Sequence, residues 1–374
     1  MMKVLLIAGA RPNFMKIAPI YRASQKNASV ICKIVHTGQH YDFEMSQAFF
    51  EDLELPEPDY FLDVGSGSHA VQTAHVMVAF EQVCIKEIPD LVIVVGDVNS
   101  TMACTIVAKK LFYTVAHIEA GLRSFDLTMP EEINRIITDS VADYHFVTEE
   151  SAIFNLQQEG KPGERIFFVG NVMIDNLYYQ LKKIHEAEDN HFKTKTMKGK
   201  LSKYIFLTLH RPSNVDDKNV LADIIAALNI IAHDMPIIFP VHPRTQKMIK
   251  KFNIKLSEHI YQLPPLSFRE ALFLWKDSFM VLTDSGGLQE ETTALGIPCL
   301  TLRKNTERPI TVKTGTNILA GTTKVSILNA YRNYNEMKTT SIVIPKKWDG
   351  KASERIWDNI LNVTKLNDGK TALI

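Results

Sequence analysis

Short apolar runs alternate with longer stretches of helical periodicity along most of the chain. Several of these runs are apolar on both faces, which is typical of strands in a buried parallel sheet. In the first half the pattern predicts strands over residues 4–8, 30–37, 91–95, 114–118 and 144–148. Between them it predicts helices over residues 14–26, 69–86, 100–111 and 131–142. Right-handed β-α-β crossovers then give a doubly wound, Rossmann-like α/β domain.

The alternation restarts after a polar stretch. Residues 185–203 contain few large apolar side chains and a cluster of lysines, so we expect a solvated surface segment near a domain junction. Beyond it the pattern predicts strands over residues 204–209, 237–241, 279–283 and 298–302, and helices over residues 219–233, 268–275 and 287–295. We therefore predict two Rossmann-like domains, residues 1–170 and 171–354. A last helix starts near residue 352. The sequence allows this helix, including residues 355–374, to pack on either domain, and packing back on the first domain is one of the two predictions.

Composition and charge narrow the class of protein. The 374 residues carry 42 Lys plus Arg and 42 Asp plus Glu, so no net charge draws the chain to nucleic acid or to an anionic membrane. No run reaches the roughly 18 apolar residues of a membrane span, and the apolar start is too short for a signal peptide before Arg11-Pro12. Four scattered cysteines lack metal-ligand spacing and are typical of core thiols in a reducing compartment. We expect a cytoplasmic protein.

Acidic residues follow the strands at one edge of the first predicted sheet. Asp97 comes just after the strand at 91–95, Glu119 ends the strand at 114–118, and Glu131 opens the next helix. Each has a structural alternative, because Asp97 can cap a helix and a first-turn Glu131 interacts favourably with the helix dipole. Together they form a cluster of carboxyl groups whose pKa values can be driven apart, which provides separate proton donors and acceptors.

Two cations lie at the turn after the first strand. Arg11 and Lys16 follow Gly9, where a helix N-terminus with nearby positive charge is suited to a diphosphate. An N-cap with surface cations is the alternative. The turn lacks the Gly-x-Gly-x-x-Gly pattern and the second strand does not end in an acidic residue, which disfavours nicotinamide-dependent hydride transfer.

Histidine-arginine pairs end two strands of the second half. His210 precedes Arg211, and His242 lies two residues before Arg244. Phosphate binding is favoured over a metal site, because no His, Asp and Glu triplet has zinc spacing. The alternative is that each histidine is an ordinary core or surface residue.

The strongest local signal is a Ser-Gly-Gly turn between a strand and a helix. Backbone N–H groups at Ser285, Gly286 and Gly287 are free of large side chains and can approach phosphate oxygens. One helical turn later, Glu291 is placed to accept hydrogen bonds from ribose hydroxyls, and Arg308 follows the next strand. A plain tight turn is the alternative.

These segments together resemble one family, the non-hydrolysing UDP-N-acetylglucosamine 2-epimerases. The match runs in order from residue 3 to about residue 321, through GARPNFMKIAP, TGQHYD, GDVNST, HIEAGLRS, MPEEINR, TLHRPSNVD, TDSGGLQEE and NTERP. The resemblance implies two Rossmann-like domains in a GT-B-like arrangement, with UDP held mainly by the C-terminal domain and the sugar between the two. It implies interconversion of UDP-GlcNAc and UDP-ManNAc by elimination of UDP to 2-acetamidoglucal and re-addition, supplying ManNAc-type sugars for cell-surface polysaccharide.

The resemblance also assigns roles to residues at matching positions. It implies a homodimer and no metal or redox cofactor. The implied catalytic group is Asp97, Glu119, Glu131 and His210. The implied substrate-binding residues are Arg11, Lys16, Arg135, Ser285, Gly286, Gly287, Glu291 and Arg308.

Two departures from the family pattern affect what we expect. The segment between Glu119 and Glu131 is two residues shorter than in the best-known bacterial members, which predicts a different shape of the sugar site. Gln39-His40 is followed by Tyr41-Asp42, whereas members with a regulatory UDP-GlcNAc site carry Gln-His-Arg there, so we do not expect that regulation.

Four alternative functions remain open on the sequence. The nearest is a 2-epimerase of a UDP-2,3-diacetamido-uronic acid, whose C6 carboxylate would need a cation such as Arg123, Arg135 or Arg244. A hydrolysing epimerase would release UDP and free N-acetylmannosamine. A GT-B glycosyltransferase would share the Ser-Gly-Gly turn and Glu291, but three converging acids exceed what simple transfer requires. The last alternative is an inactive nucleotide-sugar-binding protein.

Overall fold

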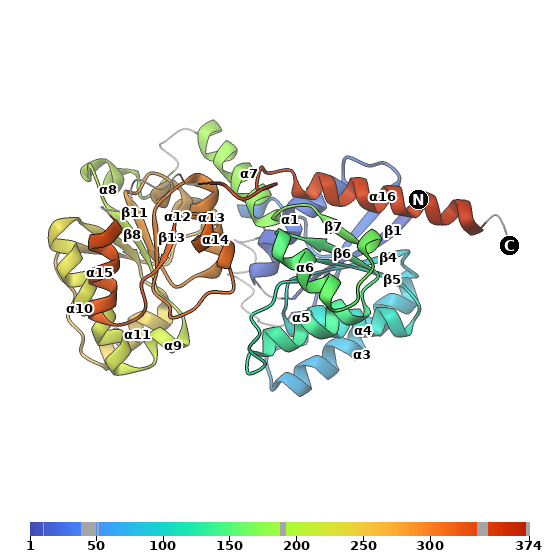
Figure 1. Cartoon of the computed structure of the whole chain (residues 1–374), viewed down its shortest axis with the longest axis horizontal. Helices are drawn as coiled ribbons and strands as arrows, with labels where there is room; N and C mark the ends of the chain where they lie inside the picture. The colour runs from blue at the N-terminus through green and yellow to red at the C-terminus, as the bar shows by residue number, and fades with distance from the viewer. Residues whose placement is uncertain (10, 39–49, 51, 188–191, 335–342, 372–374) are drawn as a thin grey trace. The chain divides into compact units, whose positions relative to one another are not determined.

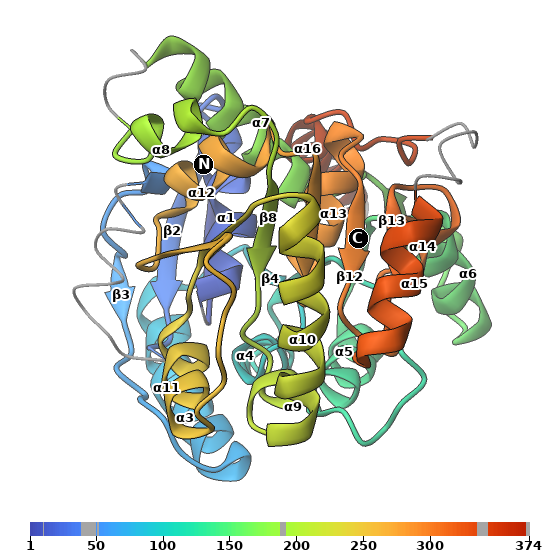
Figure 2. The same cartoon turned by 90° about the vertical axis from the view of Figure 1, so that its left-hand side faces the viewer.

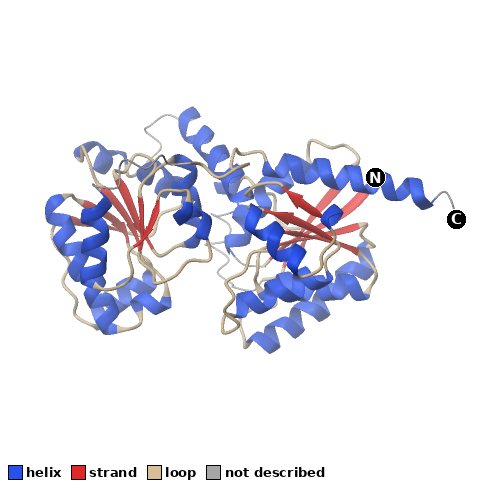
Figure 3. Cartoon of the chain, viewed as in Figure 1, coloured by secondary structure: helices blue, strands red, loops and turns tan. Residues whose placement is uncertain are grey.

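The computed structural model describes residues 1–9, 11–38, 50, 52–187, 192–334 and 343–371. The chain forms two compact units, the first comprising Met1–Tyr178 and Lys346–Ile374 and the second Tyr179–Pro345. In each unit a parallel sheet is flanked by helices, as Figure 3 shows in red and blue. Helix α7 (Val172–Glu186) begins in the first unit and ends in the second.

The first unit contains a seven-stranded parallel sheet in the order β3-β2-β1-β4-β5-β6-β7. The chain adds β2 and β3 on one side of β1 and then crosses to add β4 on its other side, so the strand order reverses at β1. Ligands of doubly wound sheets bind beyond the carboxyl ends of strands at such a point. The strands are β1 (Met2–Ala8), β2 (Val30–His36), β3 (Tyr60–Phe61), β4 (Leu91–Val95), β5 (Thr114–Ile118), β6 (Tyr144–Val147) and β7 (Ile166–Phe168).

Helices cover both faces of this sheet (Figure 1). Val, Leu and Ile side chains of β1, β2 and β4 alternate between the two faces, so both faces of the central strands are buried. Helices α3, α4 and α5 pack side by side, and α1 packs against α16. The helices are α1 (Arg11–Ser24), α3 (His69–Glu87), α4 (Asn99–Lys110), α5 (Pro130–Val141), α6 (Glu150–Gln158), the short η1 (Gly163–Arg165) and α16 (Ala352–Thr371).

The C-terminal helix α16 belongs to the first unit. The Trp357 indole N–H donates a hydrogen bond to the Ile20 carbonyl at 2.8 Å. At the start of α16, the buried Asp175 carboxylate accepts from the backbone N–H groups of Ala352 (2.9 Å) and Ser353 (2.7 Å). These bonds satisfy two of the free N–H groups at the helix N-terminus and attach residues after 346 to the first unit.

The second unit contains a six-stranded parallel sheet in the order β10-β9-β8-β11-β12-β13. Helices α10 and α15 pack together over one face and enclose an aliphatic core (Figure 2). The strands are β8 (Ile205–Thr208), β9 (Ile237–Pro240), β10 (Ile260–Leu263), β11 (Met280–Thr283), β12 (Cys299–Thr301) and β13 (Asn317–Leu319). The helices are α8 (Lys195–Lys200), α9 (Pro212–Val215), α10 (Lys218–Asp234), α11 (Pro243–Lys251), α12 (Phe268–Trp275), α13 (Gly286–Leu295), α14 (Pro309–Lys313) and α15 (Lys324–Tyr334).

The α/β class with two parallel sheets is confirmed, and every strand expected from the sequence is present within two residues. The polar stretch 185–203 differs from its expected solvated state. Phe192 in it is buried and stacks on Phe273 with ring centroids 4.1 Å apart, which anchors the start of α8. All four cysteines are buried free thiols, as expected. In the part of the chain that the structure describes, no helix is both long and apolar enough to cross a membrane.

Candidate functional site

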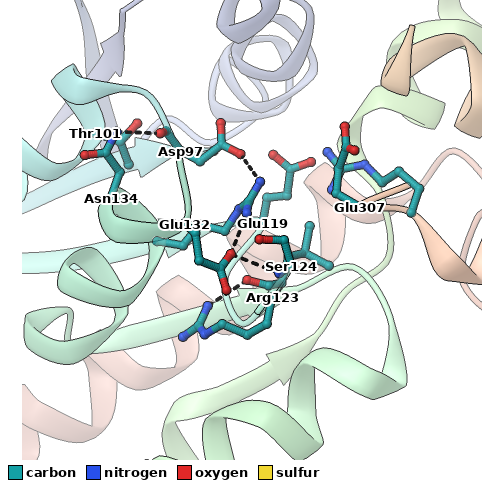
Figure 4. A network of polar contacts seen from close by, with 12 residues as sticks. Asp97, Thr101, Glu119, Arg123, Ser124, Glu132, Asn134 and Glu307 are labelled. Carbon is teal, nitrogen blue, oxygen red and sulfur yellow. Dashed lines mark hydrogen bonds and ion pairs between the residues drawn. The ribbon is translucent and has the colours of Figure 1, made fainter. Parts of the chain in front are cut away.

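The loop after β4 presents Asp97 beside a buried arginine (Figure 4). Asp97 Oδ2 accepts a hydrogen bond from Arg135 Nη2 at 2.6 Å, and its side chain stays 23% exposed. Arg135 Nη1 donates to Glu132 Oε2 at 2.7 Å, so one buried guanidinium links two carboxylates. The Asn134 side chain donates to the Asp97 carbonyl at 2.9 Å. Asp97 is therefore held at both its backbone and its carboxylate.

Glu132 is a structural residue that the sequence analysis did not select. Its carboxylate accepts from the backbone N–H groups of Ser124 (2.9 Å) and Phe125 (3.0 Å), which fixes the loop between β5 and α5. Burial alone would raise the pKa of Glu132, but these two bonds and Arg135 lower it below its usual range. The spacing of Glu132 and Arg135, three residues apart on α5, is the signal that identifies this pair.

Glu119 follows β5 in a left-handed backbone conformation, with φ 72°. Its carboxylate forms a buried ion pair with Lys16 of α1. Gly96, also left-handed with φ 73°, lies against this pair, since a Cβ there would be 3.1 Å from Lys16 Nζ and 3.3 Å from Glu119 Oε2. Glycine is thus favoured at position 96, both by its left-handed conformation and by the close approach of this pair. Gly96 directly precedes Asp97 in the chain and lies beside the Glu119 carboxylate.

Two other predicted residues of the first unit, Glu131 and Arg11, have no described contact with Asp97 or Glu119. Glu131 is exposed in the first turn of α5, next to the buried Glu132. Arg11 begins α1, but its side chain lies outside the described part of the chain, as do residues Gln39 to Asp42.

In the second unit Asp284 organises the loop after β8. Its carboxylate, which is fully buried, accepts from the backbone N–H groups of His210 (2.9 Å) and Arg211 (2.8 Å). It also lies 3.0 Å from His210 Nδ1. Burial alone would raise the pKa of Asp284, but the bonds to His210 and Arg211 lower it. Asp284 therefore orients the His210 ring, whose side chain remains 43% exposed.

The Ser-Gly-Gly turn caps α13, as its composition predicts. Ser285 is the N-cap residue, and its backbone N–H donates to Thr283 Oγ1 at 2.9 Å. A Cβ on Gly286 would lie 2.9 Å from Glu307 Oε1, so only glycine fits beside that carboxylate. The sequence analysis selected neither Glu307 nor Asp284, although Glu307 lies beside Gly286 and Asp284 beside His210. The first N–H groups of the ten-residue helix α13 have no partner within the helix, and such free N–H groups are suited to binding an anion.

Arginines surround the turn. Arg211 Nη2 lies 3.2 Å and Arg303 Nη2 2.7 Å from the Glu307 carboxylate, and Arg308 Nε lies 3.0 Å from Glu290 Oε1. Burial would raise the pKa of Glu307, but Arg303, Arg308 and Arg211 lower it to about 2. The cluster is net positive by one charge when both carboxylates are ionised, as expected beside a bound phosphate.

Glu291 differs from Glu290 and Glu307, which both contact arginines. Its side chain is buried on α13, and among the described residues no cation lies within ion-pair distance of its carboxylate. Burial, followed by the charge of Glu290, raises the pKa of Glu291 to about 8. Within the described ranges, no group of three or more His, Cys, Asp and Glu side chains is arranged to hold a metal ion.

Comparison with known proteins places this geometry in a family. The family model described as UDP-N-acetylglucosamine 2-epimerase matches residues 22–361. The chain belongs to the UDP-N-acetylglucosamine 2-epimerase family. A UDP-N-acetylglucosamine 2-epimerase of Methanocaldococcus jannaschii is 43% identical over 371 residues, 95% of this chain and 98% of the relative. A Pseudomonas aeruginosa relative named UDP-2,3-diacetamido-2,3-dideoxy-D-glucuronate 2-epimerase is 41% identical over 334 residues, 88% of this chain and 92% of the relative.

Solved structures of family members are also similar. The Methanocaldococcus jannaschii UDP-GlcNAc 2-epimerase in complex with UDP-GlcNAc and UDP superposes with a TM-score of 0.85 at 42% identity, covering 96% of this chain and all of that chain. A Neisseria meningitidis UDP-GlcNAc 2-epimerase bound to UDP-GlcNAc gives 0.84 at 30% identity, covering 96% of this chain and all of that chain. The epimerase fold thus extends over nearly the whole chain.

Proposed function

We propose that this epimerase-family enzyme interconverts UDP-GlcNAc and UDP-ManNAc without releasing the sugar. The observation that carries the proposal is that Asp97 and Glu119 follow neighbouring strands β4 and β5 at one sheet edge, each with its own buried cation. Epimerisation at C2 needs one group to remove a proton and another to return it to the opposite face, and two differently paired carboxylates supply these roles. Relatives whose names and structures specify UDP-GlcNAc support the choice of substrate.

The proposed reaction proceeds by elimination and re-addition. A carboxylate takes the C2 proton while the C1–O bond to UDP breaks, giving 2-acetamidoglucal and UDP. UDP oxygen then re-adds at C1 while a proton reaches C2 from the other face. Asp97, Glu119 and Glu131 form the proposed acid-base group, and His210, oriented by Asp284, interacts with the sugar or diphosphate. The main electrostatic task of the site is to stabilise the negative charge that develops on the departing UDP.

The second unit is the proposed UDP site. Ser285, Gly286 and Gly287 would bind the diphosphate at the N-terminus of α13, and Arg308 would lie beside it. The buried, protonated Glu291 would accept the ribose hydroxyls. Arg11, Lys16 and Arg135 of the first unit are the other proposed substrate-binding residues, and we propose that they contact the sugar.

The described cations favour a sugar that is uncharged at C6. Arg123, nominated to hold a uronic acid, has a 2% exposed side chain and is paired with Asp139 at 2.8 Å and Glu159 at 2.7 Å. Arg135 is shared by Asp97 and Glu132, and Arg244 is paired with Asp216 on an exposed surface. None of these three is left to neutralise a C6 carboxylate, which favours UDP-GlcNAc over the diacetamido-uronic acid.

Proton NMR in heavy water tests the function. The protein is incubated with UDP-GlcNAc, without added metal or nucleotide cofactor. Deuterium at C2 in a mixture of intact UDP-GlcNAc and UDP-ManNAc is the expected result. Free UDP with free N-acetylmannosamine would establish the hydrolysing reaction instead. Exchange only with the UDP-diacetamido-uronic acid would change the sugar, and exchange with neither would contradict epimerisation.

We also propose that the enzyme is a cytoplasmic homodimer, joined through helices of the first unit. Helix α3 supports this, because Val71, Val78 and Ile85 recur every seven residues and are 49%, 67% and 56% exposed. Such a stripe matches the contact seam of two packed helices. Val78→Asp should convert a dimer to a monomer in light scattering coupled to size-exclusion chromatography, and a monomeric wild type would contradict the proposal.

A further inference from the structure

A completely buried histidine lies beneath the loops that carry Asp97 and Glu119. His117 is in β5, two residues before Glu119, and its side chain has no solvent exposure. Its Nε2 lies 2.8 Å from the Gly96 carbonyl oxygen, and its Nδ1 lies 2.6 Å from Asp139 Oδ1. Neither the reaction nor UDP binding, as proposed above, uses this ring.

Both partners of the His117 ring are acceptors. A backbone carbonyl can only accept, so Nε2 must donate. Asp139 Oδ2 already accepts from the Gly121 N–H at 3.0 Å and lies 2.8 Å from Arg123 Nη2, which are the partners of an ionised carboxylate. An ionised Asp139 only accepts, so Nδ1 must donate as well.

The groups around the ring are consistent with a buried cation. Asp139 approaches from α5, and His145, the register neighbour of His117 on β6, approaches from the other side. Burial lowers the pKa of His145, which favours the neutral form of that second ring. Arg123, which also contacts Asp139, is balanced by Glu159. One imidazolium and one guanidinium therefore face two carboxylates.

The hydrogen bond to Gly96 connects this pair to the site. The Gly96 carbonyl belongs to the peptide unit that leads into Asp97. The Cα of Gly96 also lies against the Lys16–Glu119 pair, and Asp139 holds the Gly121 N–H two residues beyond Glu119. Rotation of the Gly96–Asp97 peptide would thus shift Asp97 relative to Glu119.

We propose that His117 is a positioning residue, a doubly protonated imidazolium balanced by Asp139 that fixes Asp97 relative to Glu119 for proton transfer. The role rests on the proposed epimerase function. A displacement of about 1 Å in a catalytic group lowers rates by about 100-fold, so loss of this anchor should reduce kcat without weakening substrate binding.

Two variants separate the two hydrogen bonds. In His117→Gln the amide nitrogen takes the place of Nε2 and keeps the donor to Gly96, whereas in His117→Asn it takes the place of Nδ1 and keeps the donor to Asp139. We expect kcat for epimerisation to fall about 100-fold in His117→Asn and less than about 10-fold in His117→Gln. KM and UDP affinity should stay within about threefold in both, because UDP binding uses the second unit. A purely structural histidine predicts the reverse order, or activity losses that follow thermal stability, and either result would overturn the proposal.

Neutron diffraction from a deuterated wild-type crystal tests the protonation state without any variant. We expect deuterium on both Nδ1 and Nε2 of His117 and none on Asp139. A ring nitrogen without deuterium, or a deuterated Asp139 carboxyl, would overturn the imidazolium. If the wild type exchanges the C2 proton of neither UDP-sugar, the epimerase assignment fails by itself, and the neutron map still decides the state of His117.

Discussion

In the first unit Asp97 and Glu119 at the sheet edge lie against cations, whereas the buried Glu291 of the second unit has no cation against it among the described residues. Glu119 pairs with Lys16 and Asp97 with Arg135, while burial raises the pKa of Glu291 to about 8. Asp97 and Glu119, two of the proposed acid-base residues, are therefore balanced and held in place by cations of the protein itself. Burial and the charge of Glu290 instead disfavour the ionised form of Glu291, and hydrogen-bond donors on a ligand would favour it.

The difference matches the two tasks that we propose. Proton transfer requires groups fixed to within a fraction of an ångström before the reaction starts. Nucleotide binding gains affinity when a ligand satisfies a group that the free protein leaves without a partner. The comparison therefore predicts that changes in the first unit affect rate and fold, and that a change at Glu291 affects affinity and its pH dependence.

Asp97→Asn should have the largest effect. The amide keeps the size of the side chain and still offers an oxygen to Arg135, but it cannot take a proton. We expect kcat to fall by about 10²–10⁴-fold, measured as deuterium incorporation at C2, with UDP affinity unchanged. Glu150→Gln, which alters an exposed pair with Lys346, is the matched control and should retain activity. Equal activity in Asp97→Asn and wild type would remove Asp97 from the acid-base group.

Lys16→Met tests whether the buried pairing is needed for folding. It leaves Glu119 as a buried charge without its cation, so the free energy of unfolding of the first unit should fall by roughly 3–5 kcal/mol. Hydrogen exchange of peptides covering residues 91–118 in increasing urea measures this. The double variant Lys16→Met with Glu119→Gln should recover most of the stability and none of the activity. If the double variant were as unstable as the single one, the loss would come from packing and not from charge.

The central strands were predictable because they are apolar on both faces. The run Leu91–Val95 is buried at every position. The four edge strands β3, β7, β10 and β13 were not predicted. β3, β7 and β13 have only two or three residues, and β10 exposes two of its four. A strand that is short and half exposed carries little periodic signal, and its identity depends on the neighbour with which it pairs.

The same limit separates the candidate residues that the sequence could select from the contacting residues that it could not. Asp97 and Glu119 directly follow buried strands, so their placement at the sheet edge is a local property. Asp284 and Glu307 matter through partners that are distant in sequence, such as His210, 74 residues before Asp284, and Arg211, 96 residues before Glu307. Sequence spacing contains no sign of such contacts until the fold is known.

Within the second unit, Glu307 contrasts with Glu291 because arginines lower its pKa. Its pKa is lowered to about 2 from an ordinary 4.5, so its stabilising effect is present above pH 4.5 and is lost as the pH falls towards 2. The full effect is on the order of 3 kcal/mol. Glu307→Gln should therefore flatten the loss of stability of the second unit between pH 4.5 and 2, followed by hydrogen exchange of α13 and β12. An unchanged slope in the variant would mean that other carboxylates produce it.

Glu291 gives the smallest and most specific prediction. With a pKa of about 8 in the free protein, it carries a proton at pH 7. Ribose hydroxyls that donate to it would favour the ionised form, so UDP binding should release a proton and tighten as the pH rises from 6 to 8. Calorimetry of UDP binding in two buffers of different ionisation enthalpy measures that proton.

Glu291→Gln is the matched control for this experiment, because it has nearly the same shape and cannot ionise. UDP affinity should fall by about tenfold, which corresponds to about 1.4 kcal/mol, and the proton release at Glu291 should vanish. Any proton exchanged by the UDP phosphates themselves is the same for both proteins and cancels in the difference. If the variant released as many protons as the wild type, Glu291 would already be ionised in the free protein, and the contrast between the two units would disappear.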